Sequence, residues 1–92
     1  MRIKVRALAD LRLALGGFER EVEVPGQEAT VGQVLELLYK QYPKLKEHLE
    51  HGSGRSDVAI LVDGVNIVHL QGLDTRIKDG AVVTLIPPAG GG

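Results

Sequence analysis

Charged and apolar side chains alternate in two stretches near the start of the chain. From Arg2 to Ala9 every second residue is apolar, as in a strand with one buried and one exposed face. The alternation returns from Phe18 to Val24 and stops at a Pro-Gly turn. Between the two stretches, residues 10–15 are rich in leucine and are followed by two glycines, which indicates a loop with room for one helical turn. These stretches predict an antiparallel hairpin.

A helical spacing of apolar residues follows the hairpin. Thr30 is suited to be the N-cap, and Pro43 marks the far boundary. The stripe that would face the core consists of Val31, Val34, Leu35, Leu38 and Tyr42. Residues 43–50 fit a second, short helix that carries Leu45 and Leu49. The sequence therefore predicts one main helix with a short one after it.

The second half of the chain has the composition of strands and turns. Residues 58–62 are continuously apolar, which predicts a strand buried on both faces, and Asp63-Gly64 is a strong turn signal. Residues 65–70 fit a short returning strand. A second Asp-Gly turn then leads into the last predicted strand, residues 81–86.

This order of elements predicts an α+β fold. One helix would pack across a mixed sheet of about five strands, with the last strand parallel to the first in the middle of the sheet. That arrangement is the β-grasp, or ubiquitin-like, roll. We predict a β-grasp domain over residues 1–86 and a flexible C-terminal tail over residues 87–92, Pro-Pro-Ala-Gly-Gly-Gly.

Composition narrows the classes of function. A chain of 92 residues with 43% hydrophobic residues should form one domain with a modest core and no deep catalytic cleft. The formal net charge of −1 gives no reason to expect nucleic acid as a partner, and no apolar run is long enough to span a membrane, so we expect a cytoplasmic protein. The absence of cysteine excludes disulfides, zinc-thiolate sites and a thiol nucleophile in this chain.

The tail carries the candidate chemistry. Pro87 and Pro88 have fixed φ angles and no N–H, so strand pairing should stop there. Gly90, Gly91 and Gly92 have no Cβ and would make a filament thin enough for a narrow channel. A terminal carboxylate is ionised at neutral pH and is a poor acyl electrophile, so it must first be activated, for example by adenylation. The activating enzyme would have to be a partner.

Two other motifs predict little. His48 and His51 are three residues apart, but no third ligand is placed near them, so we expect solvated histidines and no metal site. Residues 52–56 resemble a phosphate-binding loop only in their glycines and lack the lysine that would follow, which predicts a surface loop.

A family resemblance rests on motifs spread over nearly the whole chain. The sequence resembles the MoaD/ThiS family of ubiquitin-like sulfur carriers, most closely the MoaD branch, the small subunit of molybdopterin synthase, and the archaeal ubiquitin-like small modifiers. The motifs that carry this resemblance are Ala7-Leu8-Ala9-Asp10-Leu11-Arg12 with Gly16, Ala29-Thr30-Val31-Gly32, Tyr42-Pro43, Leu61-Val62-Asp63-Gly64, Asp79-Gly80-Ala81-Val82-Val83 and Ile86-Pro87-Pro88-Ala89-Gly90-Gly91.

The resemblance implies a carrier and not an enzyme. A ubiquitin-activating-type adenylating enzyme would consume ATP to join AMP to the terminal glycine, and sulfur would replace the AMP to leave a thiocarboxylate. In the MoaD branch the sulfur goes to a pterin precursor on the large subunit of molybdopterin synthase. Relatives serve cysteine, thiazole or tRNA thiolation instead. No cofactor bound to the chain itself is implied.

The resemblance also implies site residues. The activated carboxylate would belong to Gly92, or to Gly91 if the tail is trimmed, because the family usually ends in two glycines and this chain ends in three. Partners would contact an apolar sheet surface near the tail. The residues expected to bind partners are Leu8, Arg12, Ile67, Ile86, Pro87, Pro88, Gly90 and Gly91.

Two other hypotheses use the same elements. In a protein modifier, a lysine amine of a target protein would attack the activated glycine and form an isopeptide bond. In a plain β-grasp interaction domain the tail would be inert. Loss of function on deletion of Gly90 to Gly92 would separate the first two functions from the third.

Overall fold

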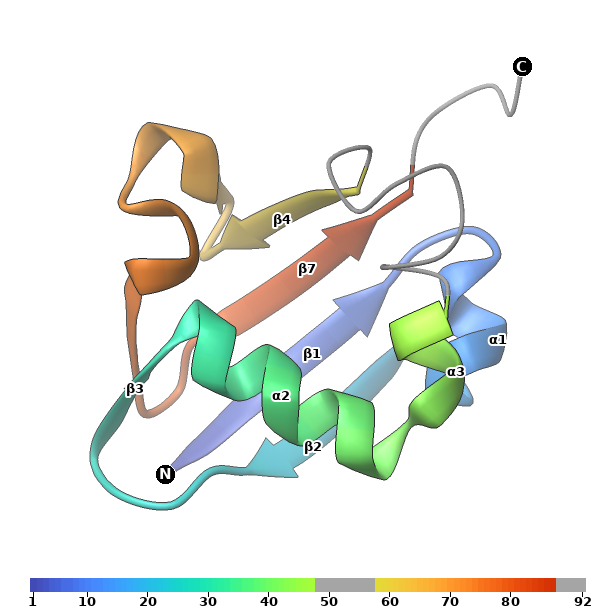
Figure 1. Ribbon diagram of the computed structural model, residues 1–92, viewed down its shortest axis with the longest axis horizontal. Coiled ribbons are helices and arrows are strands. Elements are labelled where there is room, and N and C mark those ends of the chain that lie inside the picture. The colour runs from blue at the N-terminus through green and yellow to red at the C-terminus, as the bar shows by residue number, and fades with distance from the viewer. Residues whose placement is uncertain (48–57, 88–92) are drawn as a thin grey trace.

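The fold has two layers, a five-stranded sheet and a main helix that crosses one of its faces (Figure 1). The computed structural model describes residues 1–47 and 58–87. The strand order in the sheet is β2-β1-β7-β4-β5, and β3 pairs with β6 in a separate two-stranded sheet. In chain order the elements are β1 (Arg2–Ala7), α1 (Leu11–Leu15), β2 (Glu19–Glu23), β3 (Glu28–Thr30), α2 (Val31–Gln41), α3 (Pro43–Lys46), β4 (Ala59–Val62), β5 (Val65–Asn66), the 3-10 helices η3 (Ile67–His69) and η4 (Gly72–Asp74), β6 (Arg76–Lys78) and β7 (Val82–Ile86).

The predicted hairpin is confirmed. Strands β1 and β2 pair antiparallel, with Ile3 opposite Val22 and both side chains buried. Strand β1 is shorter than predicted because Ala9 adopts a left-handed conformation with φ 52°, which an extended strand cannot contain. The residues that follow form the one helical turn of α1, which ends at Gly16 with φ 82°, the usual helix-ending conformation of glycine.

The main helix begins where the sequence predicts. The Thr30 side chain accepts a hydrogen bond from the Gln33 amide at 3.2 Å, and the Gln33 side chain accepts one from the Thr30 amide at 2.9 Å. This reciprocal capping box satisfies two amides that the first turn of a helix leaves without partners. None of the helices in the described ranges is both long and apolar enough to cross a membrane.

The central pair of the sheet is parallel, as predicted. Strand β7 lies between β1 and β4, with Val5 opposite Val83 and Ala7 opposite Leu85. Both β1 and β7 point toward the same end of the molecule (Figure 1). The chain therefore leaves the sheet from its middle and not from an edge.

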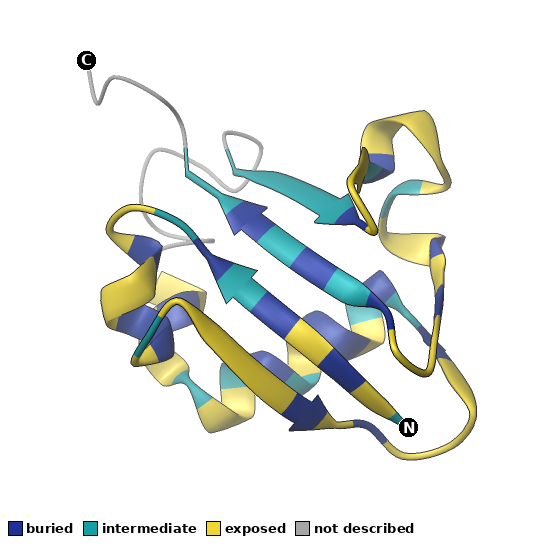
Figure 2. Ribbon diagram, turned by 180° about the vertical axis from the view of Figure 1, so that it is seen from behind, coloured by how far each residue is buried: buried dark blue, intermediate teal, exposed yellow. Residues whose placement is uncertain are grey.

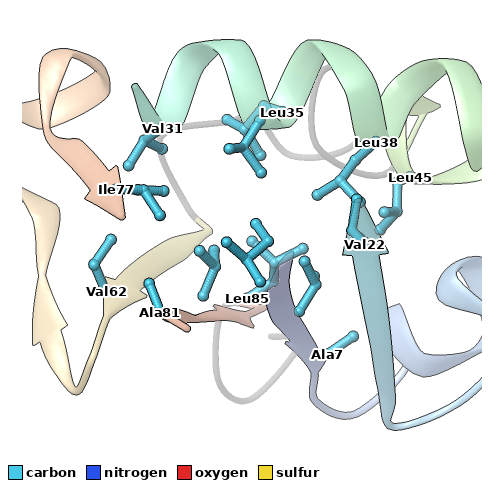
Figure 3. Packing of buried hydrophobic residues seen from close by; sticks show 14 of the residues in the cluster. Ala7, Val22, Val31, Leu35, Leu38, Leu45, Val62, Ile77, Ala81 and Leu85 are labelled. Carbon is cyan, nitrogen blue, oxygen red and sulfur yellow. The ribbon is translucent and has the colours of Figure 1, made fainter. Parts of the chain in front are cut away.

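The core lies between the sheet and α2. In Figure 3 the apolar side chains of α2 point toward those of the sheet, with Leu38 beside Val22 and Val31 beside Ile77. Every second residue of β1 and β7 joins this core, and Val5, Val83 and Leu85 have no exposed surface. Removal of this much apolar surface from water is the main stabilising term for a domain of this size.

Two predictions about the second half need correction, and one pair of strands was not predicted. Strand β4 is not buried on both faces, because only Val62 is buried and the face away from α2 has no covering layer in the described structure. The returning strand pairs only over Val65 and Asn66, since the Asn66 side chain accepts from the Val68 amide at 3.0 Å and turns the chain into η3. The β3–β6 sheet was not predicted. Leu49 of the predicted short helix lies outside the described residues, whereas Leu45 in α3 is buried as predicted.

Candidate functional site at the end of the sheet

Three strand ends meet where the C-terminal segment leaves the sheet. The Leu8 amide donates to the Leu85 carbonyl oxygen at 3.1 Å, which extends the β1–β7 ladder one residue past β1. On the other side of β7, Ile86 pairs with Ala59 of β4. The base of the C-terminal segment is therefore held from both sides, and its position is fixed by the sheet.

Pro87 follows the last paired residue. Its ring removes the N–H that another ladder hydrogen bond would need, so β7 ends at Ile86. The predicted Pro88, Gly90, Gly91 and Gly92 lie outside the described residues, as do His48, His51 and the loop at 52–56.

The face of the sheet away from α2, which we call the open face, has an apolar half. Figure 2 views the sheet from this side, where buried and intermediate residues alternate along β7. By register, the side chains of β7 and β4 that lie opposite the helix-facing set belong to Val82, Thr84, Ile86, Ala59 and Leu61. All five are intermediate in exposure. A partly exposed apolar strip thus runs along the open face to the end of the sheet where the C-terminal segment leaves.

The other half of the open face carries three cross-strand pairs of oppositely charged residues. Arg2 faces Glu23, Lys4 faces Glu21, and Arg6 faces Glu19 across β1 and β2. The Nε atoms of the two arginines donate to Glu23 at 3.2 Å and to Glu19 at 2.8 Å. Exposed pairs contribute little to folding because water and salt screen them. They give the open face a charged margin beside its apolar strip.

One carboxyl in this margin has a shifted pKa. The hydrogen bond from Arg6 lowers the pKa of Glu19 below its ordinary value, and the positive charges of Lys4 and Arg6 act in the same direction. The hydrogen bond from Arg6 therefore favours the ionised form of Glu19.

The predicted partner-binding residues fall into two groups. Leu8 and Ile86 are half-buried at the end of the sheet, Pro87 is next to them, and Arg12 is exposed on α1. Ile67 is only 8% exposed and belongs to the core. The structure thus brings Leu8, Ile86 and Pro87 together and does not place the Ile67 side chain with them. The binding roles of all these residues stay predictions.

Two exposed apolar residues near this end were not singled out by the sequence. Leu13 is 81% exposed on α1, and Phe18 is 50% exposed just before β2. Alternation placed Phe18 on the same face as Val22, but strand pairing starts only at Glu19, after two glycines with positive φ. The Gly-Gly pair directly before Phe18 was the available signal that the alternation need not extend that far.

A metal centre is not formed by the residues that the structure describes. Residues 1–47 and 58–87 contain no group of three or more histidine, aspartate or glutamate side chains placed to hold an ion.

Comparisons with known proteins agree with the geometry. The family model described as the ThiS family matches residues 5–92. Small archaeal modifier protein 3 of Haloferax volcanii is 36% identical over 93 residues, and the match covers the whole of both chains.

Solved structures show the same fold. The small archaeal modifier protein 1 of Methanosarcina acetivorans is 35% identical with a TM-score of 0.80, and the match covers 99% of this chain and 96% of that one. A candidate molybdopterin converting factor, subunit 1, from Pyrococcus furiosus is 33% identical with a TM-score of 0.78, over 97% of this chain and 99% of the other. The β-grasp prediction is confirmed.

Proposed function

The chain belongs to the ThiS family of ubiquitin-like sulfur carriers and small modifiers, and we propose that it is a sulfur carrier whose C-terminal glycine is activated by a partner enzyme. The observation that carries this proposal is the position of β7. Strand β7 lies in the middle of the sheet, is paired with β1 up to Leu85 and with β4 up to Ile86, and is followed in the sequence by Pro-Pro-Ala-Gly-Gly-Gly.

A carboxylate lacks a good leaving group, so the proposed chemistry begins by adding one. In the first step an oxygen of the terminal carboxylate attacks the α-phosphorus of ATP, and pyrophosphate leaves. In the second step a sulfide-level sulfur nucleophile attacks the acyl carbon, and AMP leaves with its bonding electrons. The product is a thiocarboxylate, a good sulfur nucleophile for a later acceptor.

The partner supplies the catalysis in this proposal. Relatives of this chain are named as small modifiers or as a sulfur carrier, so ATP would be bound and consumed by a ubiquitin-activating-type adenylating enzyme. Leu8, Ile86 and Pro87 would contact that enzyme while the glycines enter its active site, with Gly92 or Gly91 as the reacting residue.

For the sulfur acceptor we propose the large subunit of a molybdopterin synthase. The similarity to the candidate molybdopterin converting factor subunit of Pyrococcus furiosus supports this choice, because that chain has the same fold over its full length. The thiocarboxylate would then enter the active site of the large subunit and transfer its sulfur to a pterin precursor.

A second candidate function is protein modification. The full-length similarity to small archaeal modifier protein 3 of Haloferax volcanii favours it. The activation step would be the same, but a lysine amine of a target protein would attack the acyl carbon and form an isopeptide. The two functions differ only in the nucleophile that displaces AMP, so one chain can serve both.

Pyrophosphate release tests the activation step that both functions share. The full chain and a variant that ends at Pro88 are each incubated with the adenylating enzyme of the native cell and ATP. We expect release that depends on the full chain and that stops without the glycines. Equal release with both chains, or none with either, would contradict activation at the C-terminus and leave the plain interaction domain.

A further inference from the structure

Two exposed apolar side chains line one groove near the end of the sheet from which the C-terminal segment leaves. The Leu13 and Phe18 side chains are 81% and 50% exposed, and both border a shallow groove of about 790 Å³ beside α1. The rest of the lining comes from Ala9, Asp10, Arg12, Gly16 and Gly17. Exposed apolar residues scattered singly are common on proteins, whereas apolar residues gathered on one surface can mark a contact site.

The Phe18 ring is held in place although it is exposed. The guanidinium carbon of Arg6 lies 6.0 Å from the centroid of the ring, within the range of a cation–π contact. Arg6 also donates a hydrogen bond to Glu19 at 2.8 Å. The Phe18 carbonyl oxygen accepts from the Ala7 amide at 2.9 Å, which pins the backbone. A fixed aromatic ring loses little conformational entropy when a partner covers it.

The connection before Phe18 is fixed as well. Arg20 donates from Nε to the Leu15 carbonyl oxygen at 3.3 Å and from Nη2 to the Gly16 carbonyl oxygen. These are the last carbonyls of α1 and its cap, which the helix itself leaves without partners. The shape of the groove is thus set by side chains of the hairpin.

The groove continues the surface at the end of the sheet. Ala7 lies between Phe18 on one side and Leu85 on the other, and Leu8 donates to Leu85. Phe18, Leu8 and Ile86 therefore come from three neighbouring strand ends in a row. A partner that contacts Ile86 and Leu8 would meet Phe18 at the next strand end.

The groove carries an exposed guanidinium, that of Arg12, as well as the carboxylate of Asp10. Arg12 uses its Nε to bind the Ala9 carbonyl oxygen at 3.0 Å. Within residues 1–47 and 58–87, Arg12 makes no ion pair. An exposed guanidinium next to two apolar anchors fits a partner surface with an apolar pocket and a carboxylate on its rim.

We propose that Leu13 and Phe18 are the anchors by which the adenylating enzyme holds this protein, in an apolar pocket with an acidic rim that faces Arg12. The proposal rests on the proposed function. We assign the groove to the adenylating enzyme because it is the one partner that a carrier and a modifier both need, whereas the acceptors of the two differ.

The test measures pyrophosphate release at increasing concentrations of this protein. The variants are Leu13→Ser, Phe18→Ser and the double change, and the control is Val68→Ser. Val68 is 73% exposed but lies on η3, away from the groove. Phe18→Tyr keeps an aromatic ring and should restore the wild-type value.

We expect the KM for the double variant to rise about tenfold or more, as for truncation of an aromatic anchor, with kcat unchanged because the C-terminal residues are intact. Val68→Ser should match the wild type. Urea unfolding of each variant checks the fold, and Leu13→Ser alone, at a residue with little buried surface, tests the groove even if Phe18→Ser unfolds.

An unchanged KM for folded Leu13→Ser and Phe18→Ser would overturn the proposal, and so would an equal rise in KM for Val68→Ser. If the wild-type chain itself releases no pyrophosphate, the proposed function fails and this proposal fails with it. The two failures are distinct, because only the first leaves the wild type active.

Discussion

The amide of Leu8 donates to the carbonyl oxygen of Leu85 at 3.1 Å. This bond joins the residue after the first strand to the residue before the end of the last one. Since β4 pairs with the other side of β7, Ile86, which precedes Pro87, still belongs to the sheet. Pro87 therefore leaves the sheet beside the partly exposed apolar strip of the open face.

Substitutions at two adjacent residues of β7 should affect stability and partner binding differently. Leu85 has no exposed surface and faces the core, whereas Ile86 faces the open side. We predict that Leu85→Ala lowers the free energy of unfolding by about 2 to 5 kcal/mol because it leaves a cavity. Ile86→Ala should cost only about 1 kcal/mol because less apolar surface is buried there. Urea unfolding of both variants measures this difference.

Binding should show the reverse order. We predict that Ile86→Ala raises the KM for pyrophosphate release by the adenylating enzyme, while Leu85→Ala, assayed where it is folded, leaves it close to the wild-type value. An equal rise in KM for both variants would contradict a binding role for the open face.

The order of the strands could be predicted from the sequence, but the ends of the strands could not. Alternation and turn residues were enough to place β7 parallel to β1 in the middle of the sheet. The end of β1 depends on Ala9 in a left-handed conformation, which its residue type does not signal. Strands β3 and β6 are far apart in the sequence: Glu28 and Arg76, which form an ion pair between them, are separated by 48 residues. The local pattern of apolar and polar residues cannot predict such a pairing.

The capping box of α2 should contribute measurably to stability. We predict that Thr30→Ala lowers the free energy of unfolding by about 1 kcal/mol, the usual effect of losing an N-cap side chain. Thr30→Ser keeps a hydroxyl that can accept from the Gln33 amide and should keep most of that stability. A urea midpoint for Thr30→Ala equal to that of Thr30→Ser would show that the cap does not stabilise the helix.

The lowered pKa of Glu19 predicts how the stability of the protein depends on pH. Its pKa in the folded protein lies below the ordinary value of 4.5 because Arg6 donates to it. The stability that this ionised group adds is present above the pKa of the unfolded chain and is lost as the pH falls through the folded pKa. The urea midpoint of Glu19→Gln should therefore fall below that of the wild type at neutral pH and converge with it in acid.

A direct titration checks the cause. The Glu19 side-chain carboxyl, followed by NMR, should titrate below the ordinary value in the wild type. In an Arg6→Gln variant it should move back toward that value. A Glu19 pKa that is the same in both proteins would rule out Arg6 as the source of the shift.

Gly16 should be harder to replace than another glycine of the same conformation. Gly16 and Gly64 have φ angles of 82° and 86°, so alanine at either costs about 1 kcal/mol in backbone strain. A Cβ on Gly16 would lie 3.0 Å from Nη2 of Arg20, whereas one on Gly64 would meet nothing within 4 Å. Gly16→Ala should therefore cost about 0.5 to 1.5 kcal/mol more, the value of the displaced hydrogen bond.

A double variant tests whether Arg20 is the reason. In an Arg20→Ala background the extra cost of Gly16→Ala over Gly64→Ala should disappear, as measured by urea unfolding. An extra cost that persists without Arg20 would mean that another contact fixes this turn.

The sequence could predict only some of the residues at the candidate site. An apolar side chain looks the same in a sequence whether it packs inside or lies exposed. Leu8 and Ile86 were correctly expected near the end of the sheet, but Ile67 is in the core, and Leu13 and Phe18 are exposed. Whether these residues are buried or exposed depends on the geometry of two turns, one at Gly16 and Gly17 and the other after Asn66.

The most direct measurement is the mass of the C-terminal tryptic peptide, Asp79 to Gly92, released by cleavage after Lys78. The protein is taken from its native cell, or after incubation with the adenylating enzyme, ATP and a sulfur donor. We predict the mass gain of one oxygen replaced by one sulfur, on a peptide that ends at Gly92 or Gly91. A peptide that remains a plain carboxylate under these conditions, with no lysine-linked form of it on other proteins, would contradict the central claim that this terminus is activated.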